Sequence, residues 1–142
     1  MKALQNLPNL LELEISRQAY NGEKLHIKIG GFPKLKILNL QFLNALHLLM
    51  IDEGALPLLE KFVIGHSSQL KEVRCGILHL RNLKELRFID MYKEFEESLE
   101  PKLGSHYWII EHVPIVYLLH KVRTGFYDLE ARIIRSKHLI GS

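Results

Sequence analysis

The chain has 142 residues, and its 19 Lys plus Arg against 16 Asp plus Glu give a formal net charge of +3. Hydrophobic residues make up 47% and charged residues 25%, which excludes a disordered chain, and a single cysteine excludes a disulfide scaffold. A balance of +3 does not by itself argue for binding to nucleic acid or membranes.

The N-terminal residues, Met1–Pro8, contain no continuous apolar run and do not predict a signal peptide. No stretch approaches the roughly 18 apolar residues that a membrane span needs, and the nearest, Val113–Leu119, is interrupted by Pro114. We therefore expect no transmembrane segment. The lone Cys75 and the lack of an Asn-x-Ser/Thr acceptor favour a reducing cytosolic or nuclear setting.

A nine-residue pattern, apolar-x-x-Leu-x-x-apolar-x-apolar, recurs four times. Its copies begin at residues 7, 32, 56 and 80, so successive copies are 24 or 25 residues apart. The four copies are Leu7–Ile15, Phe32–Leu40, Leu56–Ile64 and Leu80–Phe88. This is the leucine-rich-repeat pattern, whose period is about 20–29 residues.

The repeat predicts an α/β leucine-rich-repeat solenoid with a parallel concave sheet of about four strands. The terminal apolar-x-apolar unit of each copy is a short strand with both apolar side chains facing inward. One unit cannot bury its own apolar face, so units stack and share a core. A helical bundle with chance periodicity is the alternative, and the recurrent glycines between copies, such as Gly30, Gly54 and Gly76, disfavour it.

The convex side is expected to be irregular. Residues 16–31 and 41–55 show no clean helical pattern and predict loops and short turns. The Asn that often follows the strand and forms a ladder is missing. Leu43 takes that place in the second repeat and Ser67 takes it in the third.

The period breaks after Phe88, and residues 90–118 are predicted to form a C-terminal helical cap. Asp90 can cap the N-terminus of a short helix, on which Met91, Phe95 and Leu99 share one face. Pro101 and Gly104 end that helix. Such a cap would cover the open core of the last repeat. The repeats themselves are assigned to residues 1–89.

The segment after the helix predicts a strand, because Val113–Leu119 is rich in β-branched and aromatic residues. Residues 119–142 are predicted to be a basic tail, weakly structured or with a short helix at Asp128–Lys137. Residues 115–142 hold five basic and two acidic groups, whereas residues 1–114 hold 14 of each, so the tail carries the whole net charge. Five spread charges are too few to indicate nucleic-acid binding.

The sequence contains no motif that indicates catalytic, cofactor-binding or metal-binding residues. Cys75 and His79 are four residues apart, but two ligands do not make a metal site, and no third group orients them as a nucleophilic pair. No P-loop motif occurs. The carboxylates between Glu94 and Glu100 indicate a solvated helix face. We therefore expect that the chain is not an enzyme.

With no catalytic or ligand-binding motif, the candidate functional region is a protein-binding surface. In a leucine-rich repeat, the residues that flank the inward strand positions project from the concave face. The candidate protein-binding residues on that face are Glu12, Glu14, Ile37, Asn39, Gln41, Lys61, Val63, Glu85, Arg87 and Ile89. Ile37, Val63 and Ile89 are expected to form an exposed apolar stripe in adjacent rows, which indicates either a protein contact or a small solvated patch.

The amino-acid sequences of the repeats resemble those of a known protein family. The runs that carry the resemblance are Leu7–Leu13, Gly30–Lys36, Asp52–Glu60, Gln69–Val73, His79–Leu86 and Met91–Phe95. Together they are similar to the C-terminal repeats of plant coiled-coil-type nucleotide-binding leucine-rich-repeat (NB-LRR) disease-resistance proteins. The resemblance covers roughly residues 4–115. Ser67-Ser68 departs from it, standing where the family often has Cys-Pro before Gln-Leu.

The resemblance implies a protein-interaction module of a plant intracellular immune receptor, acting in recognition and autoinhibition. Its implied partners are a pathogen effector, a host protein that the effector modifies, or the nucleotide-binding switch domain of the receptor. From the charge distribution we expect no nucleic-acid partner. The full-length family binds ADP or ATP in a domain that this chain lacks, so we expect no cofactor here and a chain that is a fragment or a truncated member.

The implied location is cytoplasmic, or peripheral at the inner face of the plasma membrane. The alternative is a stand-alone leucine-rich-repeat scaffold or a substrate adaptor of a ubiquitin ligase. An F-box-like helical segment before the repeats would support the adaptor, and the sequence shows none.

Overall fold

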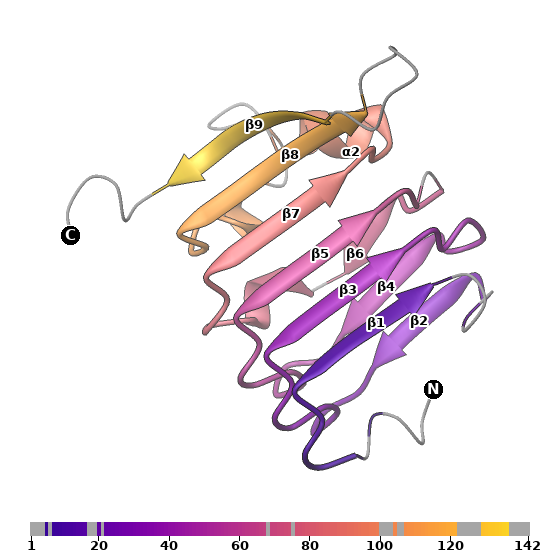
Figure 1. Ribbon diagram of the computed structural model, residues 1–142, viewed down its shortest axis with the longest axis vertical. Coiled ribbons are helices and arrows are strands. Elements are labelled where there is room, and N and C mark those ends of the chain that lie inside the picture. The colour runs from indigo at the N-terminus through magenta and orange to yellow at the C-terminus, as the bar shows by residue number, and fades with distance from the viewer. Residues whose placement is uncertain are drawn as a thin grey trace.

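The computed structural model describes residues 5, 7–16, 20, 22–67, 69–74, 76–99, 104, 107–121 and 129–136. Their strands form two β-sheets that lie one in front of the other, with an apolar core between them (Figure 1). Helices within these described residues are few and short. Among the described residues, none of the helices has the length and apolar character needed to cross a membrane.

The large sheet contains five parallel strands and one antiparallel edge strand. Its order is β1 (Glu12–Ser16), β3 (Ile37–Gln41), β5 (Lys61–Gly65), β7 (Glu85–Ile89), β8 (Ile115–Lys121) and β9 (Leu129–Ser136). The four strands expected from the repeat are confirmed as parallel neighbours, with Leu13, Leu38, Phe62 and Leu86 aligned in one row. The row continues to Val116 of β8, so the parallel part has one strand more than predicted.

The inward side chains of these strands form most of the core. Two rows point inward, and their members are Leu13, Leu38, Phe62, Leu86 and Val116 in one row and Ile15, Leu40, Ile64, Phe88 and Leu118 in the other. All except the partly buried Leu13 are buried. This α/β arrangement with a five-stranded parallel sheet is compatible with a leucine-rich-repeat solenoid.

The opposite side is more regular than expected. Strands β2 (Lys24–Ile27), β4 (Leu48–Ile51) and β6 (Glu72–Arg74) form a second, three-stranded parallel sheet, so the prediction of loops and short turns there is wrong. The cause is a second apolar-x-apolar pattern with the same step. Leu25 and Ile27 precede Leu49 and Ile51 by 24 residues, and all four are buried.

Backbone geometry recurs with the 24-residue step. Gly30 and Gly54 both have positive φ, and so do Phe32 and Leu56, each pair lying in corresponding turns before a large-sheet strand. Ser67, expected in place of the ladder Asn, is fully buried. Its hydroxyl accepts a hydrogen bond from the Leu43 N–H (3.2 Å) and donates one to the Gly65 carbonyl (3.1 Å). A single serine thus links two successive repeats.

The region after β7 departs from the predicted cap. Helix α2 (Lys93–Ser98) forms there, and Met91, Phe95 and Leu99 are buried as expected. The helix is preceded by Tyr92 rather than capped by Asp90, which has a left-handed backbone (φ 48°). The edge of β7 that faces away from β5 is paired with strand β8, so a strand and not a helix continues the sheet.

The expected strand at 113–119 is confirmed as β8, but it runs past the predicted boundary at residue 118. The short helix suggested for 128–137 is wrong, because residues 129–136 form β9 and pair antiparallel with β8. A short isolated helix is marginal in water, whereas the edge of β8 offers a row of unpaired backbone groups. The rest of the predicted tail lies outside the described residues.

Candidate functional site

The outward-facing side chains of the large sheet form the candidate site. Strand register aligns them in three cross-strand rows. The rows are Glu12, Ile37, Lys61, Glu85 and Ile115; then Glu14, Asn39, Val63, Arg87 and Tyr117; then Ser16, Gln41, Gly65, Ile89 and Leu119. The structure therefore brings all ten sequence-predicted residues together on one face, which we call the outer face.

Exposure differs along this face. Glu12 and Glu14 of β1 are exposed, and most of the other predicted residues are half-buried. Val63 was expected in an exposed apolar stripe, but only 7% of it is accessible, so that part of the prediction is wrong. The three apolar residues lie in different rows on different strands and so form a diagonal across the face, running from Ile37 through the buried Val63 to Ile89. The apolar stripe is thus broken, and the face is mainly polar.

A charged network joins strands β5, β7 and β8. The Glu85 carboxylate oxygen Oε2 accepts a hydrogen bond from Arg87 Nε at 2.6 Å and lies 3.6 Å from Lys61 Nζ. The Arg87 guanidinium lies over the Tyr117 ring, 5.0 Å from its centroid. One carboxylate and one ring thus fix the position of Arg87. Tyr117 was missed by sequence reasoning because its strand was assigned to the cap.

Two amides of β3 lie side by side on the outer face. Gln41 Nε2 donates a hydrogen bond to Asn39 Oδ1 at 2.8 Å on the same strand. Gly65 lies beside Gln41 on the next strand, and a Cβ atom at Gly65 would collide with the Gln41 amide. A side chain at position 65 would therefore displace Gln41, so this glycine keeps the amides ordered on the outer face.

A column of side chains borders the outer face where the strands end. Phe42, His66 and Asp90 each follow a large-sheet strand, and each has a left-handed backbone, with φ of 55°, 51° and 48°. The Phe42 and His66 rings stack at 4.6 Å with an angle of 7° between planes, and His66 Nδ1 lies 3.3 Å from Asp90 Oδ2. Their shared 24-residue spacing was the signal in the sequence that identifies them.

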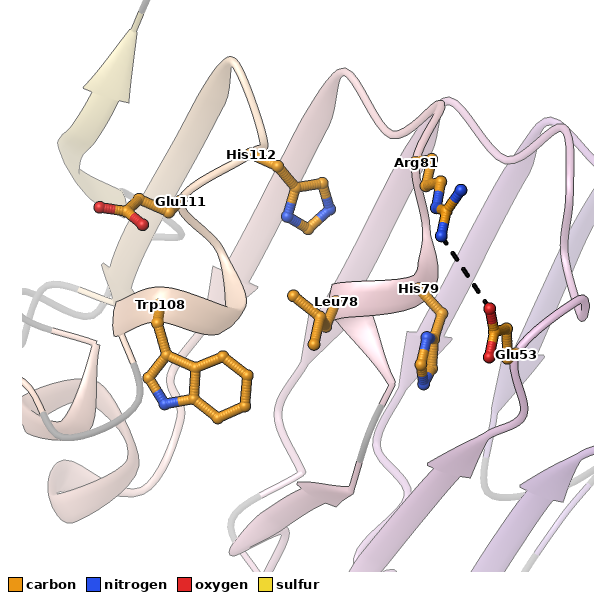
Figure 2. Close-up of a pocket in the computed structure, with 7 residues that line it drawn as sticks. All are labelled: Glu53, Leu78, His79, Arg81, Trp108, Glu111 and His112. Atoms are coloured by element: carbon orange, nitrogen blue, oxygen red, sulfur yellow. Dashed lines mark ion pairs between the residues drawn. The ribbon is translucent and has the colours of Figure 1, made fainter.

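A hollow lies at the other ends of the strands, among the turns that precede β5, β7 and β8 (Figure 2). It has a volume of about 760 Å³. Its lining residues are Glu53, Leu78, His79, Arg81, Trp108, Glu111 and His112. Sequence reasoning did not single it out, because its residues come from three turns and share no motif.

The outer face offers binding chemistry. Its side chains supply carboxylates, amides, one guanidinium and one phenol ring, which suit hydrogen-bonded contact with a protein surface. In the part of the chain that the structure describes, no three His, Cys, Asp or Glu residues gather as metal ligands do. Cys75, considered with His79 as a ligand, lies outside the described residues.

Comparison with known proteins gives a consistent group of relatives. The chain is 30% identical over 120 residues to disease resistance protein RPP8 and 31% identical over 116 residues to disease resistance RPP8-like protein 3, both from Arabidopsis thaliana. A probable disease resistance protein of the same plant, At1g59620, is 32% identical over 119 residues. These matches cover 82–84% of this chain.

The chain spans only 12–14% of the length of these relatives. No family model matches it, and no solved structure matches it. The family indicated by the repeat sequences is nevertheless confirmed, because several of its members match over most of the chain. By descent, the chain is therefore related to a segment of plant disease-resistance proteins of the NB-LRR type.

Proposed function

We propose that this chain is a leucine-rich-repeat solenoid segment that acts as the protein-interaction module of a plant intracellular immune receptor. Its relatives are disease resistance proteins, which supports a role in defence. The observation that carries the proposal is the outer face, a mainly polar surface that crosses five parallel strands in register. Short equivalent strands placed side by side give such a segment an extended binding surface.

The proposed partner is a protein: a pathogen effector, a host protein that the effector modifies, or the nucleotide-binding switch domain of the receptor. The outer face suits such a partner because its charges are arranged in a gradient. Glu12 and Glu14 make the β1 end acidic, whereas Lys61 and Arg87 outnumber Glu85 by one positive charge toward the other end. Binding of the switch domain would hold the receptor inactive until an effector competes for the face.

The proposal includes no catalysis and no cofactor. A receptor that binds nucleotide would do so through a different part of its polypeptide, and this segment would contribute recognition alone. The proposed location is the cytoplasm or the inner face of the plasma membrane, where effectors delivered into the cell would be met.

The test is co-elution of the chain with the nucleotide-binding half of a plant disease-resistance protein on a sizing column. We expect a complex with the wild-type chain. Asn39→Arg, in the middle row of the outer face, should weaken it about tenfold or more, as expected for a central interface residue. Lys93→Glu on α2, whose side chain is 83% exposed, is the matched control and should leave the affinity unchanged.

Equal weakening by Asn39→Arg and Lys93→Glu would contradict the assignment to the outer face. Absence of any complex, together with direct binding of a purified ubiquitin-ligase subunit, would instead favour the adaptor function. A purified effector that displaces the nucleotide-binding half would support competition for the outer face.

A further inference from the structure

The hollow between the turns lies apart from the outer face. Its walls come from three successive units: Glu53 from the turn before β5, Leu78 and His79 from η1 (Ile77–His79), and Trp108 from η2 (Tyr107–Ile109). All of them precede the strands of the large sheet, whereas the column that borders the outer face follows those strands. The hollow is thus a separate feature that the proposed function leaves unused.

Two large apolar side chains that line the hollow are exposed to solvent. Trp108 is 55% exposed and Leu78 is 39% exposed, although both residues belong to short helices whose neighbours Ile77 and Ile110 are buried. In Figure 2 the indole and the Leu78 side chain line the same part of the hollow. An exposed indole beside an aliphatic side chain forms a flat apolar floor, and its ring face attracts cations.

The charges around this floor favour a cationic ligand. Two carboxylates, Glu53 and Glu111, line the hollow together with a single guanidinium, that of Arg81. Arg81 Nη2 lies 3.9 Å from Glu53 Oε1, and the two side chains are 84% and 75% exposed, so water screens this pair. In the part of the chain that the structure describes, no basic side chain lies within ion-pair distance of Glu111.

His112 forms part of the wall, and its imidazole is held in place from behind. Its Nε2 donates a hydrogen bond to the Leu80 carbonyl at 3.1 Å, which leaves Nδ1 as the acceptor of the neutral ring. That Nδ1 atom is buried and has no hydrogen-bond partner within the described part of the chain. The acceptors open to a ligand are therefore the exposed carboxylates of Glu53 and Glu111 beside the aromatic floor, and a ligand rich in N–H donors would complement them.

We propose that this hollow binds an arginine side chain from a basic segment of a protein partner. A guanidinium is planar, stacks on an indole face and presents five N–H donors, so it matches both the floor and the acceptors. Its aliphatic stem would lie against Leu78. The bound arginine would neutralise Glu111, while Arg81 stays with Glu53.

Trp108 supplies the readout, because it is the only tryptophan of the chain. The full chain is titrated with the peptide acetyl-Gly-Arg-Arg-Gly-amide while Trp108 fluorescence is recorded. Saturable quenching or a spectral shift is expected. The same peptide with citrulline in place of arginine keeps the shape and loses the charge, and it should bind roughly two- to five-fold more weakly, as loss of an exposed cation–π contact predicts.

The control variants use the exposed carboxylates. Glu111→Gln should weaken binding of the arginine peptide, whereas Glu97→Gln on α2, which follows β7 instead of preceding it, should not. Raising the salt concentration from about 50 to about 500 mM should weaken binding to the wild-type chain and have less effect on Glu111→Gln. Trp108→Ala, followed by calorimetry because its fluorescence is lost, should abolish the heat of binding, and a circular dichroism spectrum establishes that it folds.

Three results would overturn the proposal: no saturable fluorescence change, equal affinity for the arginine and citrulline peptides, or equal effects of Glu111→Gln and Glu97→Gln. Tighter binding of the acidic peptide acetyl-Gly-Glu-Glu-Gly-amide would also reject it. None of these results depends on the outer face, so the failure of one proposal leaves the other standing.

Discussion

The large and small sheets are built with the same step but end differently. Both repeat an apolar-x-apolar unit at steps of 24 or 25 residues, and both bury apolar side chains in one core. The small sheet stops after β6, whereas the large sheet continues through β7 and β8 to the antiparallel β9. After the regular spacing of the repeats is lost, the large sheet therefore continues but the small sheet does not.

The segment that follows β7 along the chain explains this difference. A further small-sheet strand would follow β7, at the 24-residue step that separates β2, β4 and β6, and the helix α2 lies there instead. Val116 and Leu118, by contrast, restore the inward pattern of the large sheet 30 residues after Leu86 and Phe88. A longer insertion on one side is tolerated because it does not disturb the strand register on the other.

The largest expected effect tests whether the two sheets share one cooperative core. Phe62 of the large sheet and Leu49 of the small sheet are both fully buried. We expect Phe62→Ala to lower the free energy of unfolding by about 3–5 kcal/mol and Leu49→Ala by about 2–5 kcal/mol. Urea denaturation followed by circular dichroism measures both.

Leu58→Ala is the control for these two variants, because Leu58 is 43% exposed and its truncation should change the free energy of unfolding by less than about 0.5 kcal/mol. A cost below about 1 kcal/mol for Leu49→Ala alone would mean that the small sheet unfolds separately, and the comparison between the sheets would then be one between independent units.

A smaller effect is expected where successive repeats of the large sheet are joined. Ser67→Ala removes the acceptor of the buried Leu43 N–H and should cost about 1–3 kcal/mol of unfolding free energy. Ser16→Ala on β1 is the matched change at a half-buried position of the outer face. If thermal unfolding shows the two variants to be equally stable, the hydroxyl of Ser67 does not hold the repeats together.

The outer face should matter for binding more than for stability. Arg87→Ala breaks the contact with Glu85 and the contact with the Tyr117 ring, but it lies on the surface, so we expect a loss of at most about 1 kcal/mol in unfolding free energy. Its affinity for the nucleotide-binding half should fall more strongly than its stability. Equal losses in both measurements would make Arg87 a structural residue rather than a binding one.

The sequence predicts the large sheet well because its signal is strong and local. Four copies of one pattern are enough to predict that Leu13, Leu38, Phe62 and Leu86 lie in register, and the structure confirms that row. The outer face follows from it, since the side chains of a strand alternate between faces. Val63 is the exception, because its exposure depends on the side chains around it and not on alternation.

The small sheet and the hollow were missed for different reasons. Leu25 and Leu49 each begin an apolar-x-apolar unit, and the two units are 24 residues apart. These units were not interpreted as strands because the convex side was expected to be irregular. The hollow has no comparable signal, because Trp108 and Leu78 become neighbours only after a fifth strand continues the large sheet. Contacts of this kind depend on the length of an insertion, which a repeat pattern does not specify.

The smallest expected effect tests the small sheet at its surface. His26 on β2 donates a hydrogen bond from Nε2 to Asp52 Oδ1 at 2.7 Å, and the Ile29 N–H donates to Asp52 Oδ2 at 3.1 Å. The His26 hydrogen bond is the main cause that lowers the pKa of Asp52 below its ordinary value of 3.8, while desolvation opposes it. A carboxyl whose pKa is lowered by folding stabilises the fold above its unfolded pKa and loses that contribution as the pH falls through the folded pKa.

We therefore expect Asp52→Asn to be less stable than the wild-type chain at neutral pH, and the difference to shrink as the pH falls below about 4. Glu53→Gln, next in sequence, is the control, because its only ion pair in the described part of the chain is the exposed contact with Arg81, and its difference from wild type should stay near zero at every pH. Urea midpoints of the three proteins measured between neutral and acid pH decide the matter. A difference for Asp52→Asn that does not change with pH would mean that the carboxylate charge contributes nothing, and that shape and hydrogen bonding alone connect β2 to the turn after β4.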